Sequence, residues 1–258
     1  MSAHVGNFAA AGITILSCLA FTGLARAAEI KVLSVNGVKL VLGELVSNFE
    51  QGSGHKVTVG LGEAGVLRKR IEDGEPFDVA ILPRLATDEL VKQNKIAAGS
   101  PVNVVRAPFG IGTRAGAPKP DTSSLDAFKR FLLAAKSIVY TDPATGGVTG
   151  VFFARVLGEL GIANEINTKS KLTSGVLNAE FVARGEADIA FQMRHEILAV
   201  PGIEFVSLPS EYQRTGAVIF AASVGAGTKE SNAARAFVQF LSGPVAVLLI
   251  KTKGMEPG

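Results

Sequence analysis

Strand-like and helix-like patterns alternate along residues 29–93, and this alternation constrains the fold more than any other feature of the sequence. The strand patterns lie at 29–35, 56–61 and 78–82. Between them, apolar residues recur at helical spacing, and the connecting loops are short. Strands that alternate with helices in this way pack as a parallel sheet with helices on both faces. The sequence therefore predicts an α/β fold, in which ligands bind beyond the carboxyl ends of the strands.

A second strand–helix series follows, and it contains a corner rich in glycine and threonine. A strand pattern at 137–140 leads into residues 141–150 (TDPATGGVTG), and an apolar helical pattern comes directly after them. A helix that begins after such a loop directs free N–H groups and the positive end of its dipole toward the gap. We interpret this corner as an anion-facing site; an ordinary turn between a strand and a helix is the alternative.

Two long extended segments, at 102–113 and 216–223, interrupt the α/β pattern. We interpret them as paired crossovers between two lobes, which together form a two-segment hinge beside a cleft. The predicted divisions are lobe 1 at 28–106, lobe 2 at 107–215, and a hinge return with the C-terminal helices of lobe 1 at 216–258. One continuous α/β domain is the alternative.

The N-terminal residues predict export to the periplasm. The apolar run at 9–21 has the length of a signal peptide and is too short to span a bilayer. The small-residue pattern that ends at Ala27 predicts a signal peptide at 1–27, cleaved after Ala27. A lipoprotein signal ending at Cys18 and an N-terminal core helix are the alternatives. Because Cys18 is the one cysteine of the chain, the mature protein is predicted to have no thiol.

Composition and motifs argue against several classes of function. The formal net charge is only +3, aromatic residues make up 7% of the chain, and no basic run is present, so nucleic acid is not expected as a partner. No Gly-x-Ser-x-Gly pattern and no histidine pair at metal-ligand spacing occurs. We therefore expect no catalytic residues, no metal and no cofactor. His195 follows Arg194 near the predicted cleft and is a candidate for ligand contact, although a surface or capping histidine is the simpler interpretation.

Short motifs spread over residues 30–256 resemble the periplasmic substrate-binding proteins of ABC transporters, and within them the molybdate/tungstate-binding type. These motifs lie at 32–39, 59–67, 76–81, 142–145, 184–188, 233–237 and 241–244. The resemblance implies the type II two-lobed fold, with a mostly parallel sheet flanked by helices in each lobe. It also implies a monomer whose partners are a small anionic ligand and a membrane permease.

The resemblance assigns the ligand-binding positions one by one. That family holds a tetrahedral oxyanion with two serine hydroxyls, a tyrosine hydroxyl and backbone N–H groups. The two serines would correspond to Gly37 and Ala64, and the tyrosine to Met193, so all three hydroxyls are absent here. The backbone donors that the resemblance retains lie around Thr145, Thr149 and Val176. Because an unsatisfied buried charge costs several kcal/mol, the loss of three donors argues against molybdate.

The residues beside the substituted positions indicate a larger anion. Lys39 lies two residues past the first of them, Glu63 precedes the second, and Arg194 follows the third. We predict a small organic or aromatic carboxylate that pairs with Arg194 in a forked contact, while Glu63 accepts from a ligand hydroxyl or amine. The alternatives are a solvated Lys39, a Glu63 placed by the helix dipole, and an exposed Arg194.

The candidate ligand-binding residues are Asn36, Gly37, Lys39, Glu63, Ala64, Gly65, Thr145, Thr149, Val176, Met193 and Arg194. We predict that the protein captures a small anion by hinge closure and that its closed form delivers the anion to an ABC permease. Two alternatives stay open. One is binding of a molybdate- or tungstate-type oxyanion, and the other is a ligand-sensing domain without transport.

Overall fold

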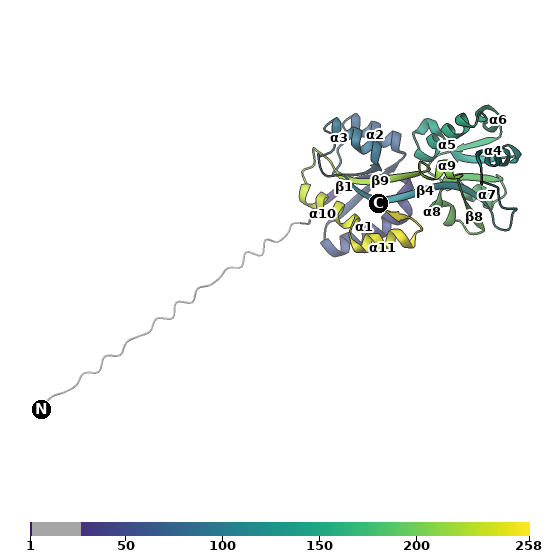
Figure 1. The fold of residues 1–258 in the computed structure, drawn as a ribbon. Helices are drawn as coiled ribbons and strands as arrows, with labels where there is room; N and C mark the ends of the chain where they lie inside the picture. The colour runs from purple at the N-terminus through teal and green to yellow at the C-terminus, as the bar shows by residue number, and fades with distance from the viewer. Residues whose placement is uncertain (2–26) are drawn as a thin grey trace.

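The structure is a computed structural model that describes residue 1 and residues 27–258, arranged as two lobes (Figure 1). The predicted signal peptide lies outside the described residues except for its two ends. The strands are β1 (Glu29–Val35), β2 (Lys56–Gly62), β3 (Val79–Pro83), β4 (Val102–Arg114), β5 (Ile138–Thr141), β6 (Ser170–Thr173), β7 (Ile189–Met193), β8 (Ile203–Ser207), β9 (Ala217–Val224) and β10 (Glu256–Pro257). The α-helices are α1 (Lys39–Ser53), α2 (Ala64–Glu72), α3 (Arg84–Lys92), α4 (Leu125–Ala134), α5 (Val148–Glu159), α6 (Ala163–Asn167), α7 (Ala179–Ala183), α8 (Arg194–Leu198), α9 (Ser210–Gln213), α10 (Ser231–Leu241) and α11 (Pro244–Thr252). Two 3₁₀ turns, η1 (Asn36–Val38) and η2 (Pro143–Thr145), precede α1 and α5.

The alternating segments at the start of the chain form the sheet of lobe 1. β1 lies between β2 and β3 and pairs in parallel with both, and β9 adds to β3 in the antiparallel direction. Helices α1, α2, α3, α10 and α11 surround these strands (Figure 1). Because each parallel strand is followed by a helix, the carboxyl ends of the strands and the N-termini of the helices meet at one edge of the lobe.

The two segments predicted as a hinge are the antiparallel pair β4 and β9, which run side by side between the lobes (Figure 1). β4 pairs with β9 as far as Pro108, which lies opposite Ala217, and from Phe109 onward it pairs with β7 instead. One strand thus belongs to the sheets of both lobes. The lobe boundaries after residues 106 and 215 stay a prediction, two residues from the point where β4 changes partners.

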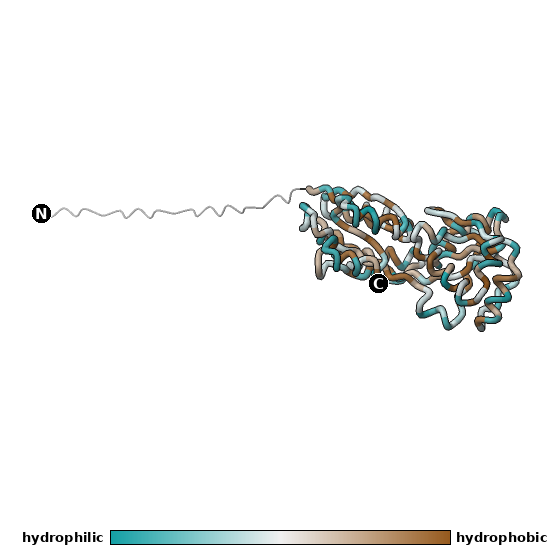
Figure 2. Tube along the Cα trace, turned by 90° about the horizontal axis from the view of Figure 1, so that it is seen from above, coloured by the Kyte–Doolittle hydropathy of each residue, from teal (hydrophilic) through white to brown (hydrophobic). Residues whose placement is uncertain are grey.

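Lobe 2 repeats the strand–helix arrangement around its own core. β5 pairs in parallel with β6 and β7, while β7 and β8 pair with β4 in the antiparallel direction. Four aromatic rings fill the space between the sheet and α5, and the rings of Phe153 and Phe191 stack with centroids 4.3 Å apart. Each lobe has its own hydrophobic interior, because the most hydrophobic segments run through the middle of each lobe (Figure 2).

Helices α10 and α11 close the chain against lobe 1, where Phe237 and Ile250 are fully buried. No single helix among the described residues is long and apolar enough to cross a membrane. In the part of the chain that the structure describes, α10 and α11 taken as a pair, bent by 52°, reach that length and composition.

Candidate ligand-binding cleft

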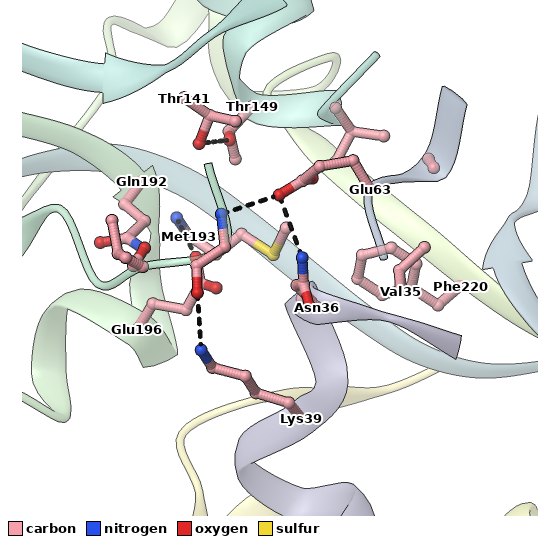
Figure 3. Close-up of a pocket in the computed structure, with 15 residues that line it drawn as sticks. Val35, Asn36, Lys39, Glu63, Thr141, Thr149, Gln192, Met193, Glu196 and Phe220 are labelled. Carbon is pink, nitrogen blue, oxygen red and sulfur yellow. Dashed lines mark hydrogen bonds between the residues drawn. The ribbon is translucent and has the colours of Figure 1, made fainter. Parts of the chain in front are cut away.

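Four strand-to-helix corners, two from each lobe, surround a small cavity between the lobes (Figure 3). Lobe 1 contributes the corners β1–α1 and β2–α2, and lobe 2 contributes β5–α5 and β7–α8. The cavity measures about 30 Å³, which is room for roughly two waters. Its lining residues are Val35, Asn36, Gly37, Lys39, Glu63, Ala64, Thr141, Val148, Thr149, Gly175, Val176, Gln192, Met193, Glu196 and Phe220.

Two helix N-termini from opposite lobes point at this cavity. Ala64 is the first residue of α2 and Val148 is the first residue of α5, and both line it. The first turn of a helix has N–H groups without helical partners and a partial positive charge. The arrangement therefore favours a negatively charged group between the lobes. Beside α5, the hydroxyl of Thr149 donates to that of Thr141 over 3.2 Å.

Side chains of lobe 1 form hydrogen bonds with the backbone of Gly175 in lobe 2, and we call this interaction the Gly175 contact. Lys39 Nζ donates to the Gly175 carbonyl oxygen at 3.0 Å, and the Gly175 N–H donates to Glu63 Oε1 at 3.2 Å. The same Glu63 oxygen accepts from Asn36 Nδ2 at 3.1 Å (Figure 3). Gly175 has a φ of 69°, a conformation that favours glycine. Both polar groups of one exposed residue are thus bonded to side chains of the opposite lobe.

A second contact between the lobes, the Gly37 contact, is buried. His195 Nε2 lies 2.8 Å from the Gly37 carbonyl oxygen, while its Nδ1 is buried without a partner among the described residues. Burial lowers the pKa of His195 to about 4, and the bond to Gly37 acts in the opposite direction. The ring is therefore neutral at pH 7, and Nε2 is the nitrogen that carries the hydrogen and donates it.

The Gly37 contact also depends on the absence of a side chain at Gly37. A Cβ at this position would lie 2.8 Å from Met193 Cε and 3.0 Å from Phe220 Cζ. Met193, buried at the end of β7, thus occupies the space that any larger residue at Gly37 needs. The glycine and the methionine are complementary in shape across the cleft.

Glu196 brings a buried carboxyl group to the same cavity. It lies in the first turn of α8, where the Met193 N–H donates to Glu196 Oε2 over 3.4 Å. Burial raises the pKa of Glu196 to about 8, and the charge of Glu63 acts in the same direction. The Met193 N–H, the Lys39 ammonium and a hydrogen bond from the Gln192 side chain act against this shift. The carboxyl is consequently protonated at neutral pH and presents both a hydroxyl donor and a carbonyl acceptor.

The structure brings eight of the predicted ligand-binding residues to the cavity: Asn36, Gly37, Lys39, Glu63, Ala64, Thr149, Val176 and Met193. Their contact with a ligand stays a prediction. Gly65 and Thr145 lie next to the cavity rather than on its wall. The Gly65 N–H donates to the Gly146 carbonyl across the lobes at 3.3 Å, and the Thr145 hydroxyl donates to the Asp142 carbonyl at 2.7 Å.

Arg194 does not line the cavity, and its predicted forked contact with a ligand carboxylate stays a prediction. Its side chain is exposed, and its guanidinium lies over the ring of Phe205, 5.8 Å from the ring centroid. The physical reason is that α8 begins at Arg194. The first helical residue turns away from the direction of Met193, whereas Glu196, two positions further on, returns to the cavity.

Sequence reasoning also missed several residues that line the cavity: Val35, Thr141, Val148, Gly175, Gln192, Glu196 and Phe220. Glu196 left one signal, because a glutamate three residues after a strand end is common in the first turn of a helix. Gly175 left another, because a Ser-Gly dipeptide such as Ser174-Gly175 is typical of turns. Among the described residues, no cluster of three His, Cys, Asp or Glu side chains is arranged to hold a metal ion.

Residues 30–256 match the model of the family described as bacterial extracellular solute-binding protein, and the chain belongs to this family. It is 29% identical over 255 residues to an aconitate isomerase of a Pseudomonas species, covering 96% of this chain and 95% of that protein. It is also 29% identical over 256 residues to the molybdate-binding protein ModA of Azotobacter vinelandii, covering 95% of this chain and 94% of that protein. The solved periplasmic molybdate-binding protein of Azotobacter vinelandii superposes with a TM-score of 0.70 at 21% identity, covering 88% of this chain and 98% of that one.

These comparisons confirm the resemblance to molybdate-type periplasmic substrate-binding proteins and the type II two-lobed fold. The family description agrees with the predicted export of the chain, whereas the cleavage site stays a prediction. The absence of catalysis also stays a prediction, because one relative is named as an enzyme.

Proposed function

We propose that this protein captures a small organic acid between its lobes in the periplasm and delivers it, as a monomer, to an ABC permease. The observation that carries the proposal is the cavity between the lobes. Lys39 and the N-terminus of α2 line it from lobe 1, and the N-terminus of α5 lines it from lobe 2. A ligand that bridges these groups stabilises the closed arrangement, because it is bonded to both lobes at once. Closure about β4 and β9 then couples ligand capture to the shape that a permease recognises.

Lys39 is the group best placed to bind a carboxylate of the ligand. Its ammonium ends at the cavity and is bonded to one neutral carbonyl, that of Gly175. Exchange of that carbonyl for a carboxylate gives a charge-assisted hydrogen bond, which is stronger than a neutral one. Lys39 therefore takes the role that the sequence had assigned to Arg194.

The two carboxyl groups of the cavity favour an organic acid over a fully ionised oxyanion. Glu63 accepts hydrogen bonds, so it suits a ligand that has a hydroxyl or amine donor. An oxyanion such as molybdate has only acceptors and would be repelled by this carboxylate. The three positions where the molybdate-binding resemblance places hydroxyl donors are Gly37, Ala64 and Met193, which supply none.

The cavity is too small for an organic acid in the arrangement observed, so ligand entry requires the lobes to move. At about 30 Å³ it holds roughly two waters. The exposed Gly175 contact is the part that gives way most readily, because water replaces its hydrogen bonds at little net cost. In the liganded form, Lys39 and Glu63 exchange their bonds to Gly175 for bonds to the acid.

A thermal-shift screen followed by calorimetry tests this proposal, because binding to the native state raises the melting temperature. The screen sets citrate, trans-aconitate, malate and benzoate beside molybdate, tungstate and sulfate. We expect a concentration-dependent increase with at least one organic acid and none with the oxyanions. An increase with molybdate or tungstate alone overturns the ligand class. No increase with any of these compounds overturns the proposed capture of a small organic acid.

A second candidate, isomerisation of an unsaturated acid, has its own support. Glu63 and Glu196 line one cavity in different environments, the first half-exposed and hydrogen-bonded, the second buried and protonated. Carboxyl groups with separated pKa values are the usual arrangement for a base and an acid acting on one substrate. A relative with 29% identity along nearly the whole chain is named as an aconitate isomerase.

The corresponding step removes a proton from one carbon of the substrate and adds another proton at a second carbon. The Glu63 carboxylate takes a proton from the carbon next to the double bond, and the electrons of that C–H bond form a new double bond. The electrons of the original double bond take the Glu196 proton at the far carbon. Glu63 ends protonated and Glu196 ionised, and exchange with water restores both. Lys39 lies in the cavity to stabilise the negative charge that develops on the substrate carboxylate.

Proton NMR of trans-aconitate incubated with the protein tests the second candidate. Isomerisation predicts the appearance of the cis isomer at a rate that falls at least 100-fold in Glu63→Gln. Glu89→Gln is the matched control, because this exposed glutamate of α3 pairs with Lys92 far from the cavity. Binding without conversion rejects the enzyme and leaves the capture proposal intact.

A further inference from the structure

The cavity contains a carboxyl group for which no cation is provided. Glu196 is buried on the cavity wall, and among the described residues no lysine or arginine forms an ion pair with it. The nearest candidate, Lys39, instead donates to the Gly175 carbonyl. The single backbone bond that Glu196 accepts, from Met193, is long at 3.4 Å. An ionised buried carboxylate with so few donors is costly.

The other charged and titratable groups around the cavity increase this cost. From the β2–α2 corner, Glu63 adds a second negative charge, while Lys39 from α1 is the positive one. His195, next to Glu196 on α8, is neutral at pH 7 because burial lowers its pKa to about 4. The cavity-lining residues of the segment around Gly175 and of β5 and β7 are uncharged. An anionic ligand would place a third negative charge beside a single ammonium.

We infer that Glu196 takes up a proton when the cleft closes and donates it in a hydrogen bond to a ligand carboxylate, so that capture of the anion is coupled to uptake of one proton. This inference rests on the proposed function. Protonation of Glu196 removes one negative charge from the cavity and adds one hydrogen-bond donor, and both changes favour binding of an anion. A protonated carboxyl thus replaces a hydroxyl donor that molybdate-type proteins have and this chain lacks.

The direction of the pH dependence follows from the two states of the cleft. In the closed form, burial raises the pKa of Glu196 to about 8, whereas in water a glutamate has its ordinary value of 4.5. Between these values the closed form binds more protons than the open form. Affinity therefore falls as the pH rises toward 8, by up to about tenfold per pH unit for one proton. Between pH 7 and 8 His195 stays neutral, and the carboxyl groups of a ligand such as malate stay ionised.

Calorimetric titration with malate at pH 7 in phosphate and in Tris measures the protons taken up, because the two buffers have different ionisation enthalpies. We expect an uptake close to one proton for the wild type and close to zero for Glu196→Gln. The amide of the variant still donates a hydrogen bond, so we expect its affinity to stay within about fivefold of wild type at pH 8 and to be independent of pH. Glu89→Gln is the control and behaves as wild type.

Binding without proton uptake in the wild type overturns this inference and leaves the capture proposal standing. If malate does not bind, the inference fails together with the capture proposal on which it rests.

Discussion

Two of the contacts between the lobes differ in burial and in chemistry. The Gly175 contact is exposed and consists of hydrogen bonds from Lys39 and Glu63 to one backbone residue. The Gly37 contact is buried and combines the His195 hydrogen bond with close packing of Met193. Water competes easily for the first and is excluded from the second. We infer that the Gly175 contact exchanges with a ligand, whereas the Gly37 contact sets how the lobes fit when closed.

The largest expected effect concerns acid pH and His195. Because burial lowers the pKa of His195 to about 4 from 6.5, the unfolded chain binds a proton that the native state does not. The free energy of unfolding therefore increases as the pH rises from 4 to 6.5. Conversely, up to about 3 kcal/mol of this free energy is lost as the pH falls from 6.5 to 4. His195→Gln keeps a donor for the Gly37 carbonyl, and it should remove the loss of stability at acid pH that His195 causes. Urea denaturation at pH 4.5 and 7 measures it, and an equal acid loss in the variant contradicts the account.

The next effect concerns the packing of Gly37. Gly37→Ala places a methyl group 2.8 Å from Met193 Cε, and overpacking of this kind costs about 1–3 kcal/mol. Met193→Ala in the same chain should recover part of the loss relative to Met193→Ala alone. Gly43→Ala is the matched control, because nothing lies within 4 Å of its Cβ position on α1, and there alanine adds stability. Additive effects of the Gly37 and Met193 changes would show that the two residues do not meet across the cleft.

A smaller effect concerns closure beside the cavity. Gly65→Ala puts a Cβ 2.9 Å from Gly146 Cα. The atoms nearest to this Cβ belong to the backbone, so they cannot rotate away as a side chain can. The lobes then close incompletely, so we expect about tenfold weaker ligand binding, equivalent to about 1.4 kcal/mol, with little change in the stability of either lobe. Calorimetry with the ligand found in the screen measures the affinity. Unchanged affinity means that the Gly65–Gly146 approach plays no part in binding.

These contacts separate what the sequence predicts from what it does not. Strand and helix periodicity predicted the lobes and the hinge strands, because apolar spacing is a local property. Lys39 and Glu63 follow strand ends and line the cavity, whereas their contact with a ligand stays a prediction. Arg194 lies outside the cavity wall and Glu196 was missed because α8 is a helix of five residues, too short to leave a clear periodic pattern. The pairing of Gly37 with Met193 depends on residues 156 positions apart, and no local pattern contains it.

The smallest effect separates the exposed contact from the buried one. Lys39→Gln removes an exposed hydrogen bond to Gly175, so the free energy of unfolding of the ligand-free protein should change by less than about 1 kcal/mol. Lys92→Gln, on the exposed face of α3, is the control. A loss as large as that expected for Gly37→Ala would mean that the Gly175 contact also maintains the fold.

Side-by-side calorimetric titration of the wild type and Lys39→Gln with malate, which has a hydroxyl donor, and with molybdate tests the central claim most directly. The account predicts that the organic acid binds the wild type, that Lys39→Gln weakens this binding by roughly 10- to 100-fold through loss of a charge-assisted hydrogen bond, and that molybdate binds neither protein. Tight binding of molybdate, with no dependence on Lys39 and no binding of the organic acid, would contradict it.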